Sequence, residues 1–342
     1  MPGVPQIVLK RQVVNCGVDR AAVCEVGRLV AQVKRPKRRS NLTSRRVVNQ
    51  GSFTAGRRAG PTAGTKSPKN TLNDLTGKEW VYFLSSVIST AYPTKGKESF
   101  SHNLRKQHPS PKPPQLLRDI VEFFTKRGQW VLDPFMGVGG TLLGAALTNR
   151  RGLGIDLNKK YLRIYSQVCK HEKIPPLFTQ CGDSRQLDTL LKPFRDKREI
   201  PPKFDLILTD PPYANMMNKI RTVSLKNGKN VTPFSNSNRD IGNLTHEDFL
   251  REFKAIIKNS LKYLKNGKYL VVFAKDLQPK IEHHNLLHAD IVAELSLLEN
   301  LRFRGYRVWF DKTQTLYPLG YPHAFVANQF HQFILIFRKE EK

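Results

Sequence analysis

The chain has 342 residues, 39% of them hydrophobic, which is enough for one large α/β domain with attachments or for two small domains. Its 57 Lys and Arg against 28 Asp and Glu give a net charge of +29, which favours a polyanionic partner, nucleic acid above all, over an anionic small molecule. The four cysteines lack C-x-x-C spacing, so we expect reduced thiols and no metal site. No apolar stretch approaches the roughly 20 residues of a membrane span, so we expect a soluble, intracellular protein with no membrane partner.

The first 70 residues are predicted to be a separate basic unit. They carry 15 Lys and Arg against two acids, which is almost half of the net charge. From Lys34 to Ala63 they are rich in Arg, Ser, Thr and Gly, a composition that predicts a flexible, disordered arm. The arm is either a solvated tail or a segment that binds DNA without sequence preference. Lys34–Arg39 also fits a nuclear-import patch. We expect the protein in the cytoplasm with the nucleoid, or in the nucleus if its source is a eukaryote.

Two helices are predicted before the first strand. Residues 73–88 form an amphipathic stretch with apolar side chains at helical spacing, which we interpret as a helix packed on the domain. A second amphipathic helix is predicted over Leu116–Phe124. Between them, the prolines of His108-Pro-Ser-Pro-Lys-Pro113 prevent a helix and favour an extended segment.

A strand, a tight turn and a helix are predicted where the apolar run from Val131 ends in a glycine loop and opens into Leu142–Leu147. The loop glycines leave no Cβ between the backbone and a ligand, and the amides of the helix N-terminus favour an electron-rich group, so a nucleotide-like ligand is implied. The loop reads G-x-G-G rather than G-x-G-x-x-G, and Asp133 ends the strand. A carboxylate there would repel a pyrophosphate but attract the ammonium and sulfonium of S-adenosylmethionine, which favours that cofactor over NAD.

Acids also end the next three predicted strands, and such strand ends line the ligand crevice of parallel α/β sheets. Asp156, after the second strand, can accept both hydroxyls of a ribose. Asp183, after the third strand, is suited equally to a ligand contact and to the N-cap of the next helix. The fourth strand, from Phe204, ends in Asp210-Pro-Pro-Tyr213.

Helix and strand continue to alternate to the end of the chain. Residues 214–243 lack apolar periodicity and are predicted to be a surface loop that contacts DNA. Tyr317–His323 is aromatic and turn-forming, and it lines the base pocket or forms a packed surface turn. The later elements are a helix over Phe249–Leu264 after a capping box at Thr245–Asp248, a strand over Gly267–Ala274, a helix over Ala289–Phe303, and strands over Tyr306–Phe310 and Gln332–Arg338.

The glycine loop Asp133-Pro-Phe-x-Gly-x-Gly139 and the tetrad Asp210–Tyr213 together resemble the motifs of the amino-group DNA methyltransferases, which methylate adenine N6 or cytosine N4. The resemblance covers roughly residues 100–340. It implies an α/β fold in residues 71–342, with a Rossmann-like seven-stranded, mostly parallel sheet and helices on both faces, beside the basic flexible arm of residues 1–70. The cofactor loop precedes the tetrad, which we interpret as a circularly permuted motif order.

The resemblance also assigns roles to residues. In the family, an H-P-x-x-K-P segment before the glycine loop contributes to the S-adenosylmethionine pocket, and the acid matched by Asp183 accepts from the adenine amino group of the cofactor. With the residues argued above, the cofactor-binding set is His108, Lys112, Asp133, Pro134, Phe135, Gly137, Gly139, Thr141, Asp156 and Asp183. The catalytic set is Asp210, Pro211, Pro212 and Tyr213, and no metal is needed.

An exocyclic amine is a poor nucleophile because its lone pair is delocalised into the ring. Asp210 can accept one amino hydrogen and the Pro211 carbonyl the other, while Tyr213 offers a face for a base flipped from a duplex or presented by a single strand. Since Asp at the first tetrad position goes mostly with adenine in the family, N6 methylation of adenine in DNA is predicted. Cytosine N4 methylation, RNA guanine N2 methylation and a catalytically idle nucleic-acid-binding module stay open. The recognition sequence, the oligomeric state and any restriction partner are not predicted.

Overall fold

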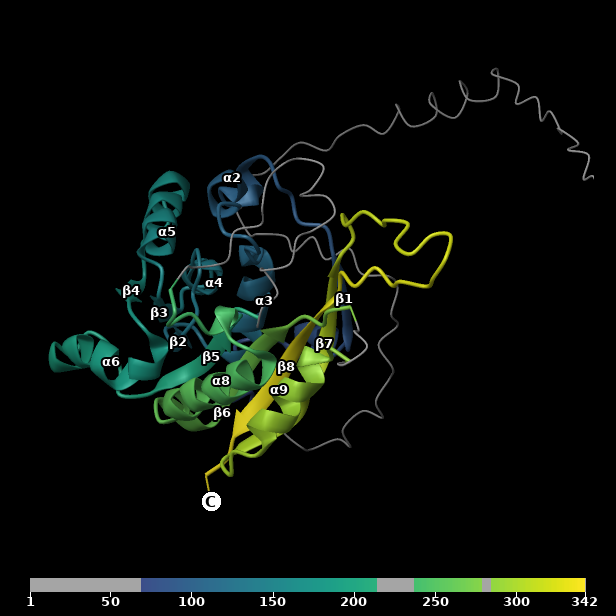
Figure 1. The fold of residues 1–342 in the computed structure, drawn as a ribbon. Helices are drawn as coiled ribbons and strands as arrows, with labels where there is room; N and C mark the ends of the chain where they lie inside the picture. The colour runs from purple at the N-terminus through teal and green to yellow at the C-terminus, as the bar shows by residue number, and fades with distance from the viewer. Residues whose placement is uncertain (1–68, 214–236, 279–283, 342) are drawn as a thin grey trace, which may run out of the picture. The chain divides into compact units, whose positions relative to one another are not determined.

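The computed structural model describes residues 69–213, 237–278 and 284–341, and these form one mixed sheet with helices on both faces (Figure 1). The strand order in these residues is β1-β7-β8-β6-β5-β2-β3-β4. All neighbouring strands are parallel except β8, which is antiparallel to both β6 and β7. The strands are β1 (Val87–Thr90), β2 (Trp130–Asp133), β3 (Arg151–Asp156), β4 (Phe178–Cys181), β5 (Phe204–Thr209), β6 (Leu264–Ala274), β7 (Leu301–Asp311) and β8 (Gln332–Lys339).

The predicted Rossmann-like class is confirmed, with eight strands in place of seven among the described residues. The additional strand is β1, which pairs in parallel with β7 from Val87 opposite Val308. The helix predicted over residues 73–88 is therefore wrong in its second half, because α1 covers only Gly77–Phe83. Val87, Ile88 and Thr90 are β-branched, and a free edge of the sheet outweighs their helical spacing.

Helices cover the two faces of the sheet in two groups. The first group packs on one face and consists of α6 (Leu187–Asp196), α8 (His246–Leu261) and α9 (Leu287–Ser296). The second group consists of α3 (Pro114–Phe124), α4 (Gly140–Ala146) and α5 (Lys159–Glu172). Along β5, Leu206 and Leu208 face the second group and Ile207 the first, all fully buried. This two-sided burial explains why the central strands read as unbroken apolar runs.

The later predicted elements are present with shifted ends. Helix α8 begins at His246, where the Thr245 side chain accepts from the Asp248 amide as an N-cap. Helix α9 ends at Ser296, because Leu301–Phe303 belong to β7. Of the predicted DNA-contacting loop, residues 214–236 lie outside the described residues, and Ile241–Asn243 form a short 3-10 helix, η3. The arm predicted over residues 1–70 lies outside the described residues apart from its last two positions. Within the described part of the chain, no helix is both long and apolar enough to cross a bilayer.

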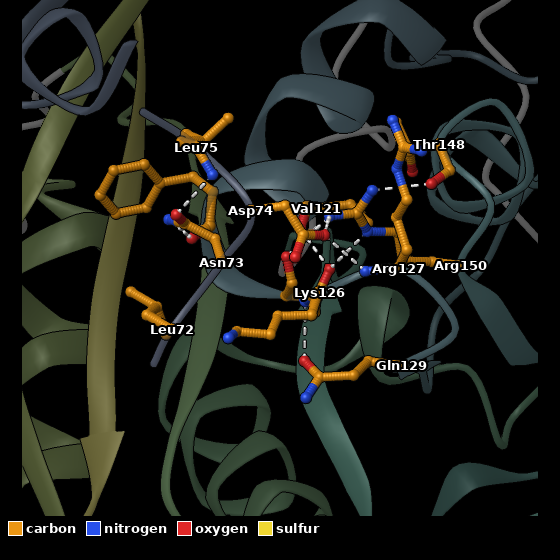
Figure 2. A network of polar contacts seen from close by, with 12 residues as sticks. Leu72, Asn73, Asp74, Leu75, Val121, Lys126, Arg127, Gln129, Thr148 and Arg150 are labelled. Carbon is orange, nitrogen blue, oxygen red and sulfur yellow. Dashed lines mark hydrogen bonds and ion pairs between the residues drawn. The ribbon is translucent and has the colours of Figure 1, made fainter. Parts of the chain in front are cut away.

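A polar network fastens residues 70–75 to the ends of α3 and α4 (Figure 2). Asn73 donates to the Phe123 carbonyl at 2.5 Å, and Asp74 accepts from the Arg127 amide at 2.8 Å. The centre of the network is Arg150, which is 4% exposed and donates to the Thr148 carbonyl at 2.7 Å and to the Thr125 carbonyl at 2.8 Å. The same guanidinium reaches Asp74 at 3.2 Å. The segment before α1 is thus part of the folded domain.

Replacing Arg150 with Met is expected to lower the free energy of unfolding by about 2 to 3 kcal/mol, because two buried carbonyls lose their donors. Urea unfolding followed by circular dichroism measures the change. The matched control is Lys192→Met, which breaks an ion pair with Asp196 whose side chains are 70% and 60% exposed. That control should cost less than about 0.5 kcal/mol. Equal midpoints for Arg150→Met and the wild type would show that the network is not stabilising.

Candidate functional site

A cavity of about 470 Å³ lies at the carboxyl ends of the parallel strands, where it is reached from β2, β3, β5 and β6. Every site residue predicted from the sequence lines it except Gly139. The sheet brings the glycine loop and the tetrad together because β2 and β5 are parallel neighbours, with Val131 opposite Leu206. A chain that places its polar motifs directly after parallel strands necessarily gathers them at one edge of the sheet.

The two predicted loop glycines serve different purposes. Both have left-handed backbone, with φ of 51° at Gly137 and 78° at Gly139. Gly137 lines the cavity, and a Cβ there would lie 3.2 Å from His108 Nε2. A Cβ on Gly139 would lie 2.1 Å from the Tyr165 ring, so this glycine allows α5 to pack against the loop. Gly139 therefore supports the loop through its packing against α5 and does not line the cavity.

Asp133 ends β2 and is 3% exposed. Its Oδ1 accepts from the Phe135 amide and from the Thr209 hydroxyl, each at 3.0 Å, and the predicted site residue Thr141 adds a side-chain hydrogen bond. Burial raises the pKa of this carboxyl to about 7, although the three hydrogen bonds lower it. The charge of Asp210 adds to the rise. Asp133 and Asp210 are thus close enough to influence each other's ionisation.

Asp156 ends β3 and fastens the glycine loop to it. One carboxylate oxygen accepts from the Gly137 amide and the other from the Asn158 amide, both at 2.8 Å. Burial raises the pKa of Asp156 to about 6. Within the described residues neither Asp133 nor Asp156 forms an ion pair. Two buried carboxylates with neutral donors alone are electrostatically incomplete, and a cationic ligand would supply the missing charge.

Asp183 follows β4 and caps the 3-10 helix η2 (Ser184–Gln186), accepting from the Arg185 amide at 3.0 Å. The Arg185 guanidinium adds a fork of contacts to both carboxylate oxygens, the shortest at 2.8 Å, and also reaches Glu252 at 3.2 Å. Burial opposes ionisation of Asp183, but the hydrogen bonds and charge of Arg185 hold its pKa below the ordinary value. The N-cap alternative is realised, while the predicted contact to the cofactor adenine stays a prediction. No sequence argument pointed to Arg185.

Asp210 stands at the end of β5 with both carboxylate oxygens engaged. The Lys112 ammonium pairs with Oδ2, and the Tyr213 hydroxyl donates to Oδ1 at 2.8 Å. Lys112, predicted from the resemblance to serve the cofactor, is 7% exposed and contacts the acid of the tetrad, with Nζ 5.3 Å from the Phe273 ring centroid. Tyr213 is 5% exposed, and burial raises its pKa well above the ordinary value. In this conformation Tyr213 orients Asp210, and its role as a stacking face stays a prediction.

The remaining predicted residues form the walls of the cavity. The Pro134 carbonyl accepts from the Ser184 hydroxyl at 2.5 Å, and the Phe135 ring packs 6.1 Å from Phe253. His108 meets the Tyr161 ring edge-on at 4.7 Å between centroids. Burial, helped by the charge of Lys112, lowers the pKa of His108 to about 3, so its ring is neutral at physiological pH. Tyr161 escaped notice in the sequence because it occupies an ordinary apolar position of α5.

The cavity continues past Asp210 to residues that the sequence did not assign. Aromatic side chains of three separate segments line this end, namely Tyr92, Trp309 and Phe330. Lys275 and Gln332 also line it. Within the described residues, the buried Oε1 of Gln332 has no hydrogen-bond partner. This part of the cavity thus combines aromatic walls with the polar side chains of Lys275 and Gln332.

Residues 41–167 match a family model described as DNA methylase. Among curated proteins, the Type II methyltransferase M2.DpnII of Streptococcus pneumoniae is 47% identical over 58 residues, which are 17% of this chain and 22% of that protein. The chain is related to the amino-group DNA methyltransferases. The family resemblance predicted from the two motifs is thereby confirmed, while the permuted motif order stays an interpretation.

One curated relative acts on RNA by name. The tRNA (guanine(10)-N2)-dimethyltransferase of Methanocaldococcus jannaschii is 33% identical over 142 residues, which are 40% of this chain and 38% of that enzyme. A crystal structure of TrmN from Thermus thermophilus matches with a TM-score of 0.40 and 17% identity, over 66% of this chain and 48% of that one. The matched segments thus span well under half the length of these two curated relatives.

Proposed function

We propose that this protein transfers a methyl group from S-adenosylmethionine to the N6 amino group of adenine in DNA. The observation that carries the proposal is the placement of Asp210 in one cavity with Asp133 and Asp156, two buried carboxylates that form no ion pair within the described residues. One end of the cavity suits a cationic nucleoside and the other a flat amine-bearing base. The kinship with amino-group DNA methyltransferases supports this division.

The cofactor end fits S-adenosylmethionine by the chemistry of its donors. Asp133 and Asp156 favour a ligand that carries positive charge, and Gly137 exposes backbone where a Cβ would crowd His108. Asp183 lines the same end. When bound, S-adenosylmethionine supplies a methyl group activated by the positive sulfonium.

The chain's own contribution to the chemistry lies at Asp210. Its carboxylate accepts one hydrogen of the target amine and the Pro211 carbonyl accepts the other, which localises the nitrogen lone pair for attack. Lys112 and Tyr213 occupy one acceptor site on each carboxylate oxygen, which leaves lone pairs of Asp210 for the amine. Methylation leaves one proton too many on the nitrogen, and Asp210, hydrogen-bonded to that nitrogen, passes it to solvent.

The second candidate is methylation of guanine N2 in RNA. The match to the tRNA enzyme of Methanocaldococcus jannaschii covers 40% of this chain, against 17% for the pneumococcal DNA enzyme. Guanine N2 is also an exocyclic amine, so Asp210 and Pro211 would serve it in the same way. Cytosine N4 presents the same pair of hydrogens and is the alternative target in DNA.

One experiment separates these targets. The full chain is incubated with S-adenosylmethionine and either DNA or tRNA, the nucleic acid is digested to nucleosides, and mass spectrometry identifies the product. The expected product is N6-methyladenine from DNA. N4-methylcytosine alone would overturn the choice of base and keep the mechanism, whereas N2-methylguanine from tRNA alone would establish the second candidate.

The affinity for S-adenosylmethionine is expected to rise with pH between about 5.5 and 7.5, by an order of ten- to a hundredfold. Asp133 and Asp156, with pKa values of about 7 and 6, are increasingly ionised across this range, and only their charged forms attract the ligand. Calorimetric titration measures the effect below pH 7.5, where an α-amino group is mostly charged.

Asp133→Asn should flatten the upper part of this pH dependence, because the group with the higher pKa is removed. Asp156→Ala should weaken the affinity at every pH. An unchanged affinity in Asp156→Ala would show that the ribose assignment is wrong. A wild-type affinity that does not change with pH would show that neither carboxylate contributes to binding of S-adenosylmethionine.

A further inference from the structure

The connection between β7 and β8, residues 312–331, displays a group of apolar side chains to solvent. Tyr321 is 80% exposed and Phe325 93%. Figure 1 shows the loop in yellow, extending beyond the ends of the two strands. The sequence offered two interpretations of Tyr317–His323, and the structure places it on the surface, away from the cavity lining. The other exposed apolar side chains of the loop are Leu316, Tyr317 and Leu319.

Hydrogen bonds within the loop fix its shape. The Asn328 side chain bridges both backbone groups of Tyr317, accepting from its amide at 2.9 Å and donating to its carbonyl at 2.8 Å. Gln278, in the loop after β6, donates to the Ala327 carbonyl. Gly320 adopts a left-handed φ of 74°, and a Cβ there would lie 2.2 Å from the Ala324 carbonyl oxygen. These hydrogen bonds therefore hold the backbone of the loop in one shape while the side chains of Tyr321 and Phe325 stay exposed to solvent.

Both stems of the loop are walls of the cavity. The chain leaves β7 through Asp311, Thr313 and Gln314 and returns through Phe330 and Gln332, and all five residues line the cavity. The exposed aromatic rings thus belong to an element that begins and ends beside the space for the target base. This continuity makes the loop a neighbour of whatever enters that space.

The charge of the whole chain favours a polyanion over a protein partner. Residues 312–331 contain Lys312, His323 and His331 and no acid, in a chain of net charge +29. We propose that this loop is a DNA contact in which Tyr321 and Phe325 stack on the bases next to the one that enters the cavity, an inference that rests on the proposed function. Base stacking on aromatic side chains tolerates any sequence, because every base has a π face.

The test compares full-length variants by fluorescence anisotropy with a fluorescein-labelled single-stranded DNA of mixed sequence. The double variant Tyr321→Ala with Phe325→Ala is expected to bind about ten- to a hundredfold more weakly than the wild type. The slope of log affinity against log salt should not change, because the substitutions remove no cation that could pair with a phosphate. The matched control is Leu297→Ala, which removes a 67% exposed side chain before the opposite end of β7 and should bind like the wild type.

Calorimetry with S-adenosylmethionine checks that the double variant keeps its cofactor site. If the double variant binds the DNA as tightly as the wild type, the loop contact is overturned. An equal loss of affinity in Leu297→Ala would also overturn it, as would a wild-type protein that binds single-stranded RNA but not single-stranded DNA. The product analysis of wild-type methyl transfer tests the proposed function separately. If that analysis finds no methylated DNA but the double variant still loses DNA affinity, the proposed function falls and the DNA contact stands.

Discussion

Asp210→Ala is expected to lower the rate of methyl transfer in a single turnover by on the order of 10³-fold. The carboxylate is the acceptor that localises the lone pair of the target amine, whereas Asp133, which also lines the cavity, already accepts from Phe135 and Thr209. Affinity for S-adenosylmethionine should be kept or rise slightly, because removal of the Asp210 charge lets Asp133 ionise more readily. Rapid-quench transfer of a tritiated methyl group measures the rate, and calorimetry measures the affinity.

The substitution leaves the buried Lys112 ammonium without its partner, which by itself would destabilise the fold. A double variant, Asp210→Ala with Lys112→Met, removes both charges and restores a neutral interior. It should be as inactive as the single variant and as stable as the wild type. A double variant with wild-type activity would show that Asp210 takes no part in the reaction.

Lys112→Met alone separates the two roles considered for this lysine. If Lys112 served the cofactor, as the resemblance implied, the variant would lose affinity for S-adenosylmethionine. Its contact with Asp210 and its 7% exposure lead us to expect a change in transfer rate instead, with cofactor affinity kept. The pair of readouts therefore assigns the residue to one end of the cavity.

The sequence predicted the edge of the sheet where the site lies because parallel strands bring their carboxyl ends together whatever their order. Asp133 and Asp156 end β2 and β3, and Asp183 and Asp210 follow β4 and β5 within two residues, so the local pattern is enough to find them. The eighth strand was missed since β1 is held by its pairing with β7, which lies more than 200 residues later. A strand of four residues is too short to show an alternating pattern, so the helical spacing of the residues before it decided the prediction.

Contacts between distant side chains were equally beyond reach. Lys112 and Asp210 are 98 residues apart, and their pairing depends on the way the extended segment before α3 crosses the end of β5. Arg185 lies only two residues from Asp183, yet its fork on that carboxylate depends on η2 and on Glu252 of α8. Residue types and strand ends thus revealed which groups gather at the site, while the partners of those groups required the tertiary structure.

Removal of residues 1–68 is expected to weaken DNA binding strongly and to flatten its dependence on salt. Residues 1–68 hold 14 Lys and Arg, and each cation that pairs with a phosphate adds about 0.9 to the slope of log affinity against log salt for duplex DNA. Removing six such cations would reduce the slope by about 5, which corresponds to an order of 10³-fold in affinity between 50 and 200 mM salt. Anisotropy titrations of the full and truncated chains over that range measure both quantities.

The end of the truncation matters, because the Asn70 carbonyl accepts from Lys126 at 2.9 Å and its side chain donates to the Leu75 carbonyl at 3.0 Å. A cut after residue 68 spares these contacts, so cofactor affinity should be unchanged. A full-length control in which Arg35, Lys37, Arg38 and Arg39 become Gln removes four cations and should give an intermediate slope. If the truncated chain keeps the wild-type slope, the basic segment makes no phosphate contacts, and the positive charge that holds DNA must lie on residues 69–342.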